Sequence, residues 1–240
     1  MKKGTKIVGL ILAAVLLMSA SVFGTLAYLQ STTNQLQNVF TVGKVEIKLD
    51  EAKTNENGQP LDSNGGLASD RKTAVRIDGS TAQTTGNEYK LMPSKVYTKD
   101  PTVTVKKESE DCYVFIKVVN NLNYKAGSPA TDKTLEAAAS NNYTPIATQI
   151  TTGTDAWTAY SGVDNVYYKE FTHNANATSD TEWEVFTLFK IRDDAEQQDF
   201  DDYVAYYPNA SDRYITIKAA AIQTEGLTLA QAYNEIKNNL

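Results

Sequence analysis

The chain has 240 residues, with 23 lysines and arginines against 29 aspartates and glutamates, which gives a formal net charge of −6. An acidic chain of this kind lacks the cationic surface needed to hold nucleic acid or an anionic bilayer. The sequence contains one cysteine and one histidine. These counts exclude an internal disulfide, a cysteine-based zinc site and a metalloprotease motif with two histidines. An exported domain of this composition would be stabilised by its apolar core alone.

The first 27 residues have the organisation of an export signal. Three lysines within the first six residues precede an apolar run over residues 7–18, and small residues then lead to Ala27. This pattern predicts a hydrophobic signal helix over residues 1–27, with cleavage between Ala27 and Tyr28 by an export signal peptidase. The alternative is an uncleaved anchor, because no charged residue occurs from residue 7 to residue 29, about the length needed to span a bilayer. Both interpretations predict that residues 28–240 are exported and that only the signal segment contacts the membrane. We therefore expect the protein to be secreted or to lie on the surface of a Gram-positive-type bacterium.

The segment 28–49 opens the exported part of the chain. Residues 28–38 are polar and uncharged. From residue 39 the odd-numbered positions carry residues that suit a core, and the charged residues Lys44, Glu46 and Lys48 alternate with them. This alternation predicts a half-buried strand. Its core-facing positions are Val39, Thr41, Gly43, Val45, Ile47 and Leu49.

The middle of the chain has the pattern of several short strands. Residues 50–66 have turn composition, and residues 73–78 and 87–92 are expected to form short strands. The strongest strand pattern covers residues 97–105 and 112–119, with a polar break at 106–111 that we expect to be a hairpin loop.

The second half adds two expected helices to further strands. Residues 131–141 are rich in helix formers and predict a short inserted helix. Residues 146–150, 163–171, 182–191 and 214–222 are expected to be strands. Thr228 and Gln231 form a capping box that predicts a C-terminal helix. The whole pattern predicts a mainly β protein, a jelly-roll-like β-sandwich in which residues 28–240 form a single domain.

Residues that could carry chemistry have competing interpretations. The acidic stretch 193–202 could bind calcium, but it lacks the EF-hand loop pattern, so we expect a solvated surface. Glu182 and Glu184 share one strand face without evident pocket residues, and we expect no catalytic pair there. His173 lies in a loop and is expected to be structural. We assign the chain no catalytic residue, no metal ligand and no cofactor.

Cysteine and aromatic residues are interpreted in the same way. Cys112 adjoins a buried strand and is expected to act as a small apolar residue, with an intermolecular disulfide as the alternative. The aromatic residues, 10% of the chain, suit a sandwich core, and sugar stacking by an adhesin is the alternative.

Several segments resemble one known family. Residues 24–29 and 40–45 resemble exported proteins processed by a SipW-type signal peptidase. Residues 90–101 resemble the K-x-x-P-G-x-x-x-x-K-D segment of the TasA/camelysin family, and residues 110–118 and 219–226 are similar to two of its strands. Ser94 stands where that family has a glycine, which would change the turn type, and residues 124–208 have no counterpart. The matching positions are Lys90, Leu91, Pro93, Lys99, Asp100, Pro101, Cys112 and Tyr113.

The resemblance implies a secreted subunit of biofilm matrix fibres, with the segment 28–49 as a candidate donor strand that adds to the next subunit. Self-association is the partner interaction that it implies, together with other matrix proteins or polysaccharide. The alternative function is a monomeric adhesin or binding module on the cell surface. A camelysin-like metallopeptidase is disfavoured, because the sequence lacks spaced metal ligands, and we expect no enzymatic activity.

Overall fold

The computed structural model describes residues 44–79, 86–126 and 130–240. These residues belong to one unit of the chain, Gly43–Leu240. The predictions for the signal helix, for Ala27 and Tyr28, and for Val39, Thr41 and Gly43 fall outside the described residues. Within the described part, none of the helices combines the length and the apolar character that crossing a bilayer needs.

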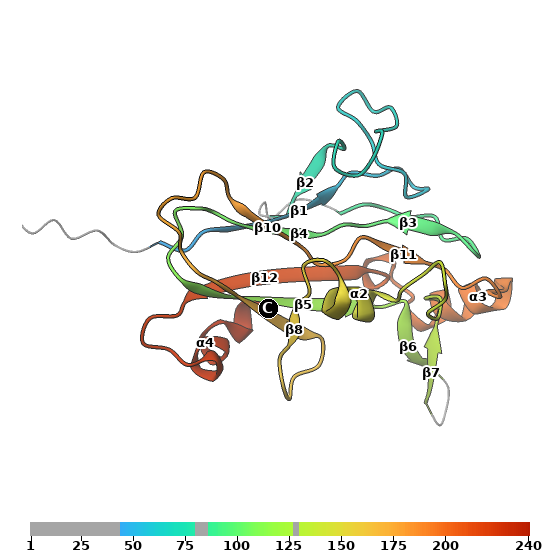
Figure 1. The fold of residues 1–240 in the computed structure, drawn as a ribbon. Helices are drawn as coiled ribbons and strands as arrows, with labels where there is room; N and C mark the ends of the chain where they lie inside the picture. The colour runs from blue at the N-terminus through green and yellow to red at the C-terminus, as the bar shows by residue number, and fades with distance from the viewer. Residues whose placement is uncertain (1–43, 80–85, 127–129) are drawn as a thin grey trace, which may run out of the picture. The chain divides into compact units, whose positions relative to one another are not determined.

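Two antiparallel sheets of four strands form the layers of this unit (Figure 1). In spatial order, one sheet consists of β10 (Thr181–Glu184), β4 (Thr102–Val105), β1 (Ile47–Ala52) and β2 (Arg76–Asp78). The other consists of β12 (Ile215–Gln223), β5 (Cys112–Asn120), β9 (Val166–Phe171) and β8 (Thr158–Ala159). Two smaller antiparallel pairs are β11 (Leu188–Lys190) with β3 (Val96–Thr98), and β6 (Asn123–Ala126) with β7 (Thr131–Thr134). The expectation of a mainly β protein is therefore confirmed.

The helices lie at the ends of the sheets or on the outside of one of them (Figure 1). They are α2 (Ile146–Thr152), α3 (Gln197–Tyr206) and α4 (Leu229–Ile236), with short 3₁₀ turns at Ala210–Asp212 and Lys237–Asn239. The capping box predicted for the last helix is present: the Thr228 hydroxyl accepts the Gln231 N–H, and the Gln231 side chain accepts the Thr228 N–H at 2.9 Å. The C-terminal helix was therefore predicted correctly, down to its first residue.

The main core lies between the two sheets because each sheet turns alternate side chains inward. Strand β5 contributes Val114, Ile116 and Val118, and β4 contributes Val103 and Val105, all of them buried. Strand β12 turns every second residue toward the same core, as the sequence predicted. These β12 residues are Ile215, Ile217, Ala219 and Ala221.

A second, smaller cluster forms on the opposite face of β5. Phe115 is fully buried there, against Val166 and against Ala232 and Ile236 of α4. Strand β5 is thus covered on both faces, which explains why its sequence is apolar on nearly every residue.

The strand pattern around residue 47 is confirmed over the described residues. Val45, Ile47 and Leu49 all contact the main core. Within β1, Ile47 and Leu49 pair with Val105 and Val103 of β4. The strand then continues to Ala52, where it pairs with β2.

The prediction of a hairpin at residues 106–111 is wrong. Strand β4 pairs with β1 and β10 in one sheet, whereas β5 pairs with β12 and β9 in the other. The segment therefore crosses from one layer to the other. The reason is that β5 is apolar on both faces and needs a cover on each of them. In the second sheet, the first sheet covers one face of β5 and α4 covers the other.

The prediction of an inserted helix at residues 131–141 is also wrong, and so is the strand predicted at 146–150. Residues 131–134 form β7, and the helix α2 begins at Ile146. Tertiary contacts override local helix propensity here. Glu136 is buried, and its carboxylate accepts hydrogen bonds from the Tyr143 hydroxyl (2.7 Å) and from the Ile146 N–H (2.8 Å). The Ile146 N–H is one of the free donors at the start of α2, so Glu136 stabilises the helix from outside.

Three further strand predictions need smaller corrections. Residues 87–92 do not form a strand. The long strands predicted at 97–105 and 182–191 are each divided, the first at residues 99–101 and the second at 185–187. The two interruptions face each other, since the Val185 N–H donates to Pro101 O at 2.8 Å and the Lys99 N–H donates to Thr187 O at 3.2 Å.

We predict that Cys112 is inert in the folded protein. Its side chain is fully buried, and burial raises the pKa of the thiol to about 11, so the nucleophilic thiolate is scarce at pH 8. A thiol reagent at pH 8 should label the denatured chain fully and the native chain hardly at all, and non-reducing electrophoresis should show no disulfide-linked dimer. Equal labelling of both states would contradict this.

The raised pKa of Cys112 also affects stability at alkaline pH. The unfolded thiol ionises near pH 8.5, so the stability contributed by the neutral thiol is complete below that pH. It decreases as the pH rises toward about 11, the pKa of the thiol in the folded protein.

Candidate site: a groove beside the edge strand β12

Among the strands that the structure describes, β12 has β5 as its one neighbour and forms an edge of its sheet. The Asn121 N–H donates to Tyr214 O at 3.0 Å, so the backbone groups of Tyr214 point toward β5. Backbone direction alternates along a strand, and the register of β12 with β5 is continuous over nine residue pairs. The backbone groups of Ile215, Ile217, Ala219 and Ala221 therefore point away from β5, toward the open side of the sheet.

A groove of about 820 Å³ lies beside this edge. One wall is β12, and the opposite wall is formed by β1, β2 and residues 86–91 of the other sheet. The apolar residues that line these walls include Leu49, Ile77, Tyr89, Leu91, Ile215 and Ile217. The groove therefore combines an apolar surface with a row of strand backbone groups, which are the two features that an added strand requires.

Helix α3 lines one end of the groove. Phe200, Tyr203 and Val204 contribute to the lining, and Val204 is 45% exposed. Burial raises the pKa of Tyr203 to about 12, so this phenol stays neutral. The three side chains that this helix contributes to the lining are thus uncharged, and Arg213 also lines the groove.

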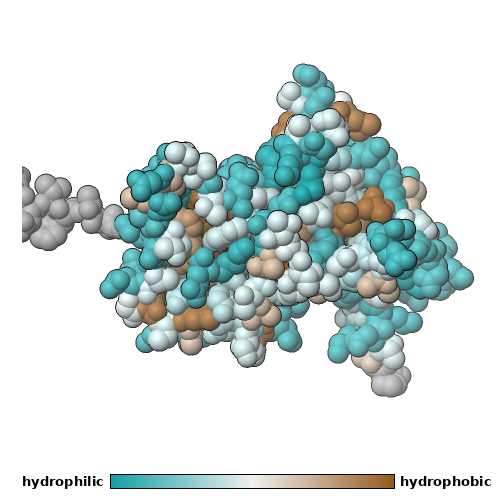
Figure 2. Space-filling model, in the orientation of Figure 1, coloured by the Kyte–Doolittle hydropathy of each residue, from teal (hydrophilic) through white to brown (hydrophobic). Residues whose placement is uncertain are grey.

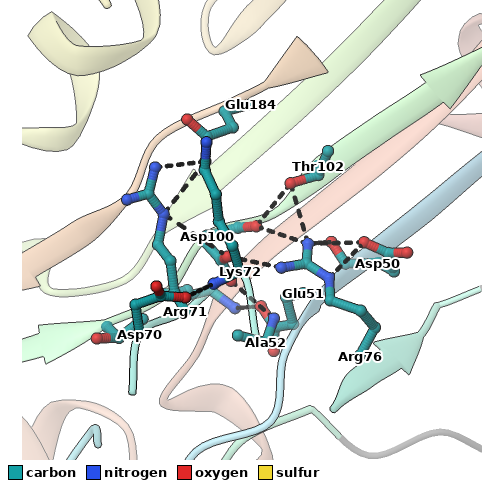
Figure 3. A network of polar contacts seen from close by, with 12 residues as sticks. Asp50, Glu51, Ala52, Asp70, Arg71, Lys72, Arg76, Asp100, Thr102 and Glu184 are labelled. Atoms are coloured by element: carbon teal, nitrogen blue, oxygen red, sulfur yellow. Dashed lines mark hydrogen bonds and ion pairs between the residues drawn. The ribbon is translucent and has the colours of Figure 1, made fainter. Parts of the chain in front are cut away.

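Ionic contacts fix the wall that β1 and β2 form. Arg76 of β2 donates to Asp50 at 2.7 Å and 2.9 Å, to Asp100 at 2.6 Å and to Thr102 at 3.0 Å (Figure 3). Arg71 donates to Glu184 at 2.5 Å and lies 3.9 Å from Asp100. These contacts join β2, β1, β4 and β10 across the whole sheet.

Asp100 is the buried centre of this network, with 1% of its surface exposed. The ladder between β1 and β4 ends at the pair Asp50–Thr102, so the next outward donor of β1, the Ala52 N–H, has no backbone partner in that ladder. The Asp100 carboxylate takes over by accepting the Ala52 N–H at 2.7 Å. Burial raises the pKa of Asp100, and the Ala52 N–H and the Arg76 guanidinium oppose that rise.

The structure places the family-like residues of segment 90–101 on or near the groove. Leu91, Lys99 and Pro101 line it. The Lys90 carbonyl accepts the Tyr97 hydroxyl at 2.6 Å, and that hydroxyl in turn accepts the Met92 N–H at 2.8 Å. The turn that contains Pro93 is thus held against β3 by Tyr97.

Ser94 explains why a glycine suits this turn. Its φ is 64°, in the left-handed region that glycine enters without strain. The serine therefore keeps the backbone conformation expected for a glycine and carries the steric cost of its Cβ.

The remaining predicted residues lie elsewhere. Cys112 faces the main core and Tyr113 contacts the second cluster, so neither reaches the groove. His173 is held by its ring, since Nδ1 lies 2.9 Å from Ser109 O. Glu184 belongs to the ionic network through Arg71.

The acidic stretch forms the start of α3 and contacts cations of this chain. Asp193 pairs with Lys190, and Asp199 pairs with Arg192. Over the ranges that the structure describes, no group of three or more histidine, cysteine, aspartate or glutamate residues could hold a metal ion.

Sequence reasoning missed Arg71, Arg76 and the contribution of α3. Arg76 occupies a position in a predicted strand, but its partners are distant in sequence, and no local pattern identifies them. Searches against protein-family models, curated proteins and solved structures find no match for this chain.

We predict that Asp100→Asn destabilises the protein. Breaking a buried ion pair costs about 3–5 kcal/mol of unfolding free energy. Because Arg76 keeps Asp50 as a carboxylate partner, we expect a loss at the lower end, about 3 kcal/mol. The measurement is denaturant unfolding. The matched control is Asp132→Asn, which removes an exposed carboxylate paired with Lys125 and should change stability by less than about 0.5 kcal/mol. Equal effects of the two substitutions would contradict the prediction.

We also predict that Ser94→Gly stabilises the protein. Relief of the left-handed strain, less the added flexibility of the unfolded chain, should give about 0.5–1 kcal/mol. Thermal unfolding measures the gain. Ser179→Gly is the control, because Ser179 does not have a positive φ, and it should be neutral or destabilising. A loss of stability in Ser94→Gly would refute the strain argument.

Proposed function

We propose that this protein is a secreted structural subunit of extracellular matrix fibres with a jelly-roll-like sandwich, and that subunits join when the N-terminal segment of one adds as a strand to the next. The observation that carries the proposal is the groove beside β12, where outward backbone groups lie opposite a wall that carries apolar side chains together with paired charged ones. The resemblance of residues 90–101 to the TasA/camelysin family supports the same function.

The donated segment is residues 28–43. Residues 44–46 are already bonded within the domain, since the Glu110 N–H donates to Lys44 O and the Lys106 N–H donates to Glu46 O. Ile47 and Leu49 pair with β4. Of the candidate donor positions, Val39, Thr41 and Gly43 therefore remain available without dismantling β1, whereas Val45, Ile47 and Leu49 anchor the segment.

Length and charge both suit this assignment. Residues 28–43 extend to about 50 Å, and the nine residues of β12 cover about 30 Å, so the segment can span the edge and still leave a connector. No residue from 28 to 43 carries a charged side chain. The segment can therefore enter an apolar groove without burying an unpaired charge.

The proposed contact leads to a fibre because donor and acceptor are different surfaces. Each subunit would give its N-terminal segment to one neighbour and receive another segment at β12. Such a head-to-tail contact grows into a filament unless the rotation between subunits closes a ring.

A monomeric adhesin is the second candidate, and one observation favours it. Tyr206 and Tyr214 are 44% and 43% exposed near the end of the groove, and exposed aromatic rings can stack on sugars. The face in Figure 2 is mostly hydrophilic, with hydrophobic residues in separate small patches. That face offers no broad apolar platform, so the groove remains the better candidate for an interaction.

Removing the donor is the first test. The mature chain should form filaments in negative-stain microscopy, and a variant lacking residues 28–43 should remain a folded monomer, because β1 and its hydrogen bonds are intact. A synthetic peptide of residues 28–43 should cap the mature chain and shorten its filaments. A mature chain that stays monomeric at every concentration would refute the fibre function and favour the adhesin.

Removing one acceptor group is the second test. Ile217→Pro deletes an outward N–H at the groove without removing a bond to β5, so the sheet should persist while assembly is lost. Ile217→Val makes a similar reduction in side-chain volume and keeps the N–H, and it should assemble. Assembly of both variants at the same rate would show that the β12 edge is not the acceptor.

A further inference from the structure

Three side chains from separate segments meet at the wall of the groove. Lys99 lies in the break between β3 and β4, Glu51 lies in β1, and Asn87 lies in the segment after β2. Lys99 Nζ donates to Glu51 Oε2 at 2.6 Å, and Asn87 Nδ2 donates to Glu51 Oε1 at 3.0 Å. One carboxylate therefore holds an amine on one oxygen and a carboxamide on the other. Glu51 lies near the Asp100 network (Figure 3).

The surroundings of this triad favour a reaction between the amine and the carboxamide. Lys99 and Glu51 are 7% and 8% exposed, which limits competition from water. The Asn87 carbonyl oxygen accepts the Thr54 N–H at 2.7 Å. This donor is aimed at the oxygen on which negative charge develops when a nucleophile attacks the carboxamide carbon.

The amide nitrogen of Asn87 is also held in place. Besides its bond to Glu51, Nδ2 donates to Ala52 O at 2.8 Å. The carboxamide is thus fixed at both ends, with its oxygen on Thr54 and its nitrogen between Ala52 and Glu51. Such fixation supplies the proximity that an intramolecular reaction exploits.

We propose that Lys99 and Asn87 form an intramolecular isopeptide bond, with Glu51 as the catalytic acid and base. Glu51 takes a proton from the Lys99 ammonium, and the freed amine attacks Asn87 Cγ to form the Nζ–Cγ bond. The Cγ–Nδ2 bond then breaks as Glu51 returns the proton to the leaving nitrogen. Two protons pass in all from Nζ to that nitrogen, which departs as ammonium. No oxidation or co-reactant is involved, and Glu51 is regenerated.

This modification is independent of fibre formation, because all three residues belong to one subunit. The bond would tie residue 87 to residue 99 and so fix the segment 86–91, which lines the groove. It would close a covalent loop in a chain whose single cysteine allows no internal disulfide.

Tryptic mapping of the protein purified from its own cells tests the proposal directly. Cleavage should give residues 77–90 joined to residues 96–106, with a mass one ammonia below the sum of the two peptides. Cleavage after Lys99 should be lost. A synthetic linear peptide of residues 96–106, digested in parallel, should be cut after Lys99, which excludes slow cleavage as the reason for the loss.

The chain offers an internal control. Lys95 Nζ donates directly to Asn57 Oδ1 at 2.6 Å, the same pair of residue types in contact but without a carboxylate between them. Cleavage after Lys95 should be normal, and no peptide should join residue 57 to residue 95. In Glu51→Gln, with folding checked by circular dichroism, the linear peptides should replace the joined species.

Two results would overturn the proposal. The first is full recovery of linear residues 96–99 and 100–106 from the native protein, which would show that Lys99 and Asn87 remain an unreacted buried pair whatever the behaviour of any variant. The second is an undiminished joined peptide in Glu51→Gln, which would remove Glu51 from the catalytic role.

Discussion

The hydrogen bond from the Ala52 N–H to the buried carboxylate of Asp100 fixes where one sheet can be built. It lies just beyond the pair Asp50–Thr102, where the ladder between β1 and β4 ends and β1 continues beside β2. Arg76 connects the same carboxylate to Asp50 and Thr102. This junction ties the end of β1 to the start of β4, and so helps to fix the wall of the groove opposite β12.

The groove depends on both sheets at once. Strand β12 supplies the backbone edge, and β1, β2 and residues 86–91 supply the facing wall. The two walls approach each other because one apolar core lies between the layers, with buried side chains from β4 of one sheet and β5 of the other. The second cluster beneath α4 covers the other face of β5 and so holds β12 in register. The surface that we propose as the acceptor is therefore positioned by residues that do not line it.

The sequence predicted the parts of this fold that local patterns encode. A run that is apolar on both faces identified β5, alternation identified β12 and the core face of Val45, Ile47 and Leu49, and the Thr228–Gln231 capping box identified α4. Sheet membership was not predictable in the same way, because nothing local to residues 106–111 distinguishes a hairpin from a crossing between layers. The inserted helix was misplaced because the buried carboxylate of Glu136 acts on Ile146, ten residues later. Of the site, Lys99 and Asp100 were noticed through a resemblance, whereas Arg76, Glu51 and Asn87 emerge only when distant segments come together.

The alternation along β12 has a consequence for how this edge can evolve. The residues whose backbone groups face outward, Ile215, Ile217, Ala219 and Ala221, are the ones whose side chains fill the core. A charged residue at any of them would repel an unwanted strand, but it would also be buried without a partner. Charged side chains at these four positions therefore cannot protect the edge against indiscriminate aggregation, and a segment that occupies the edge can do so without disturbing the core.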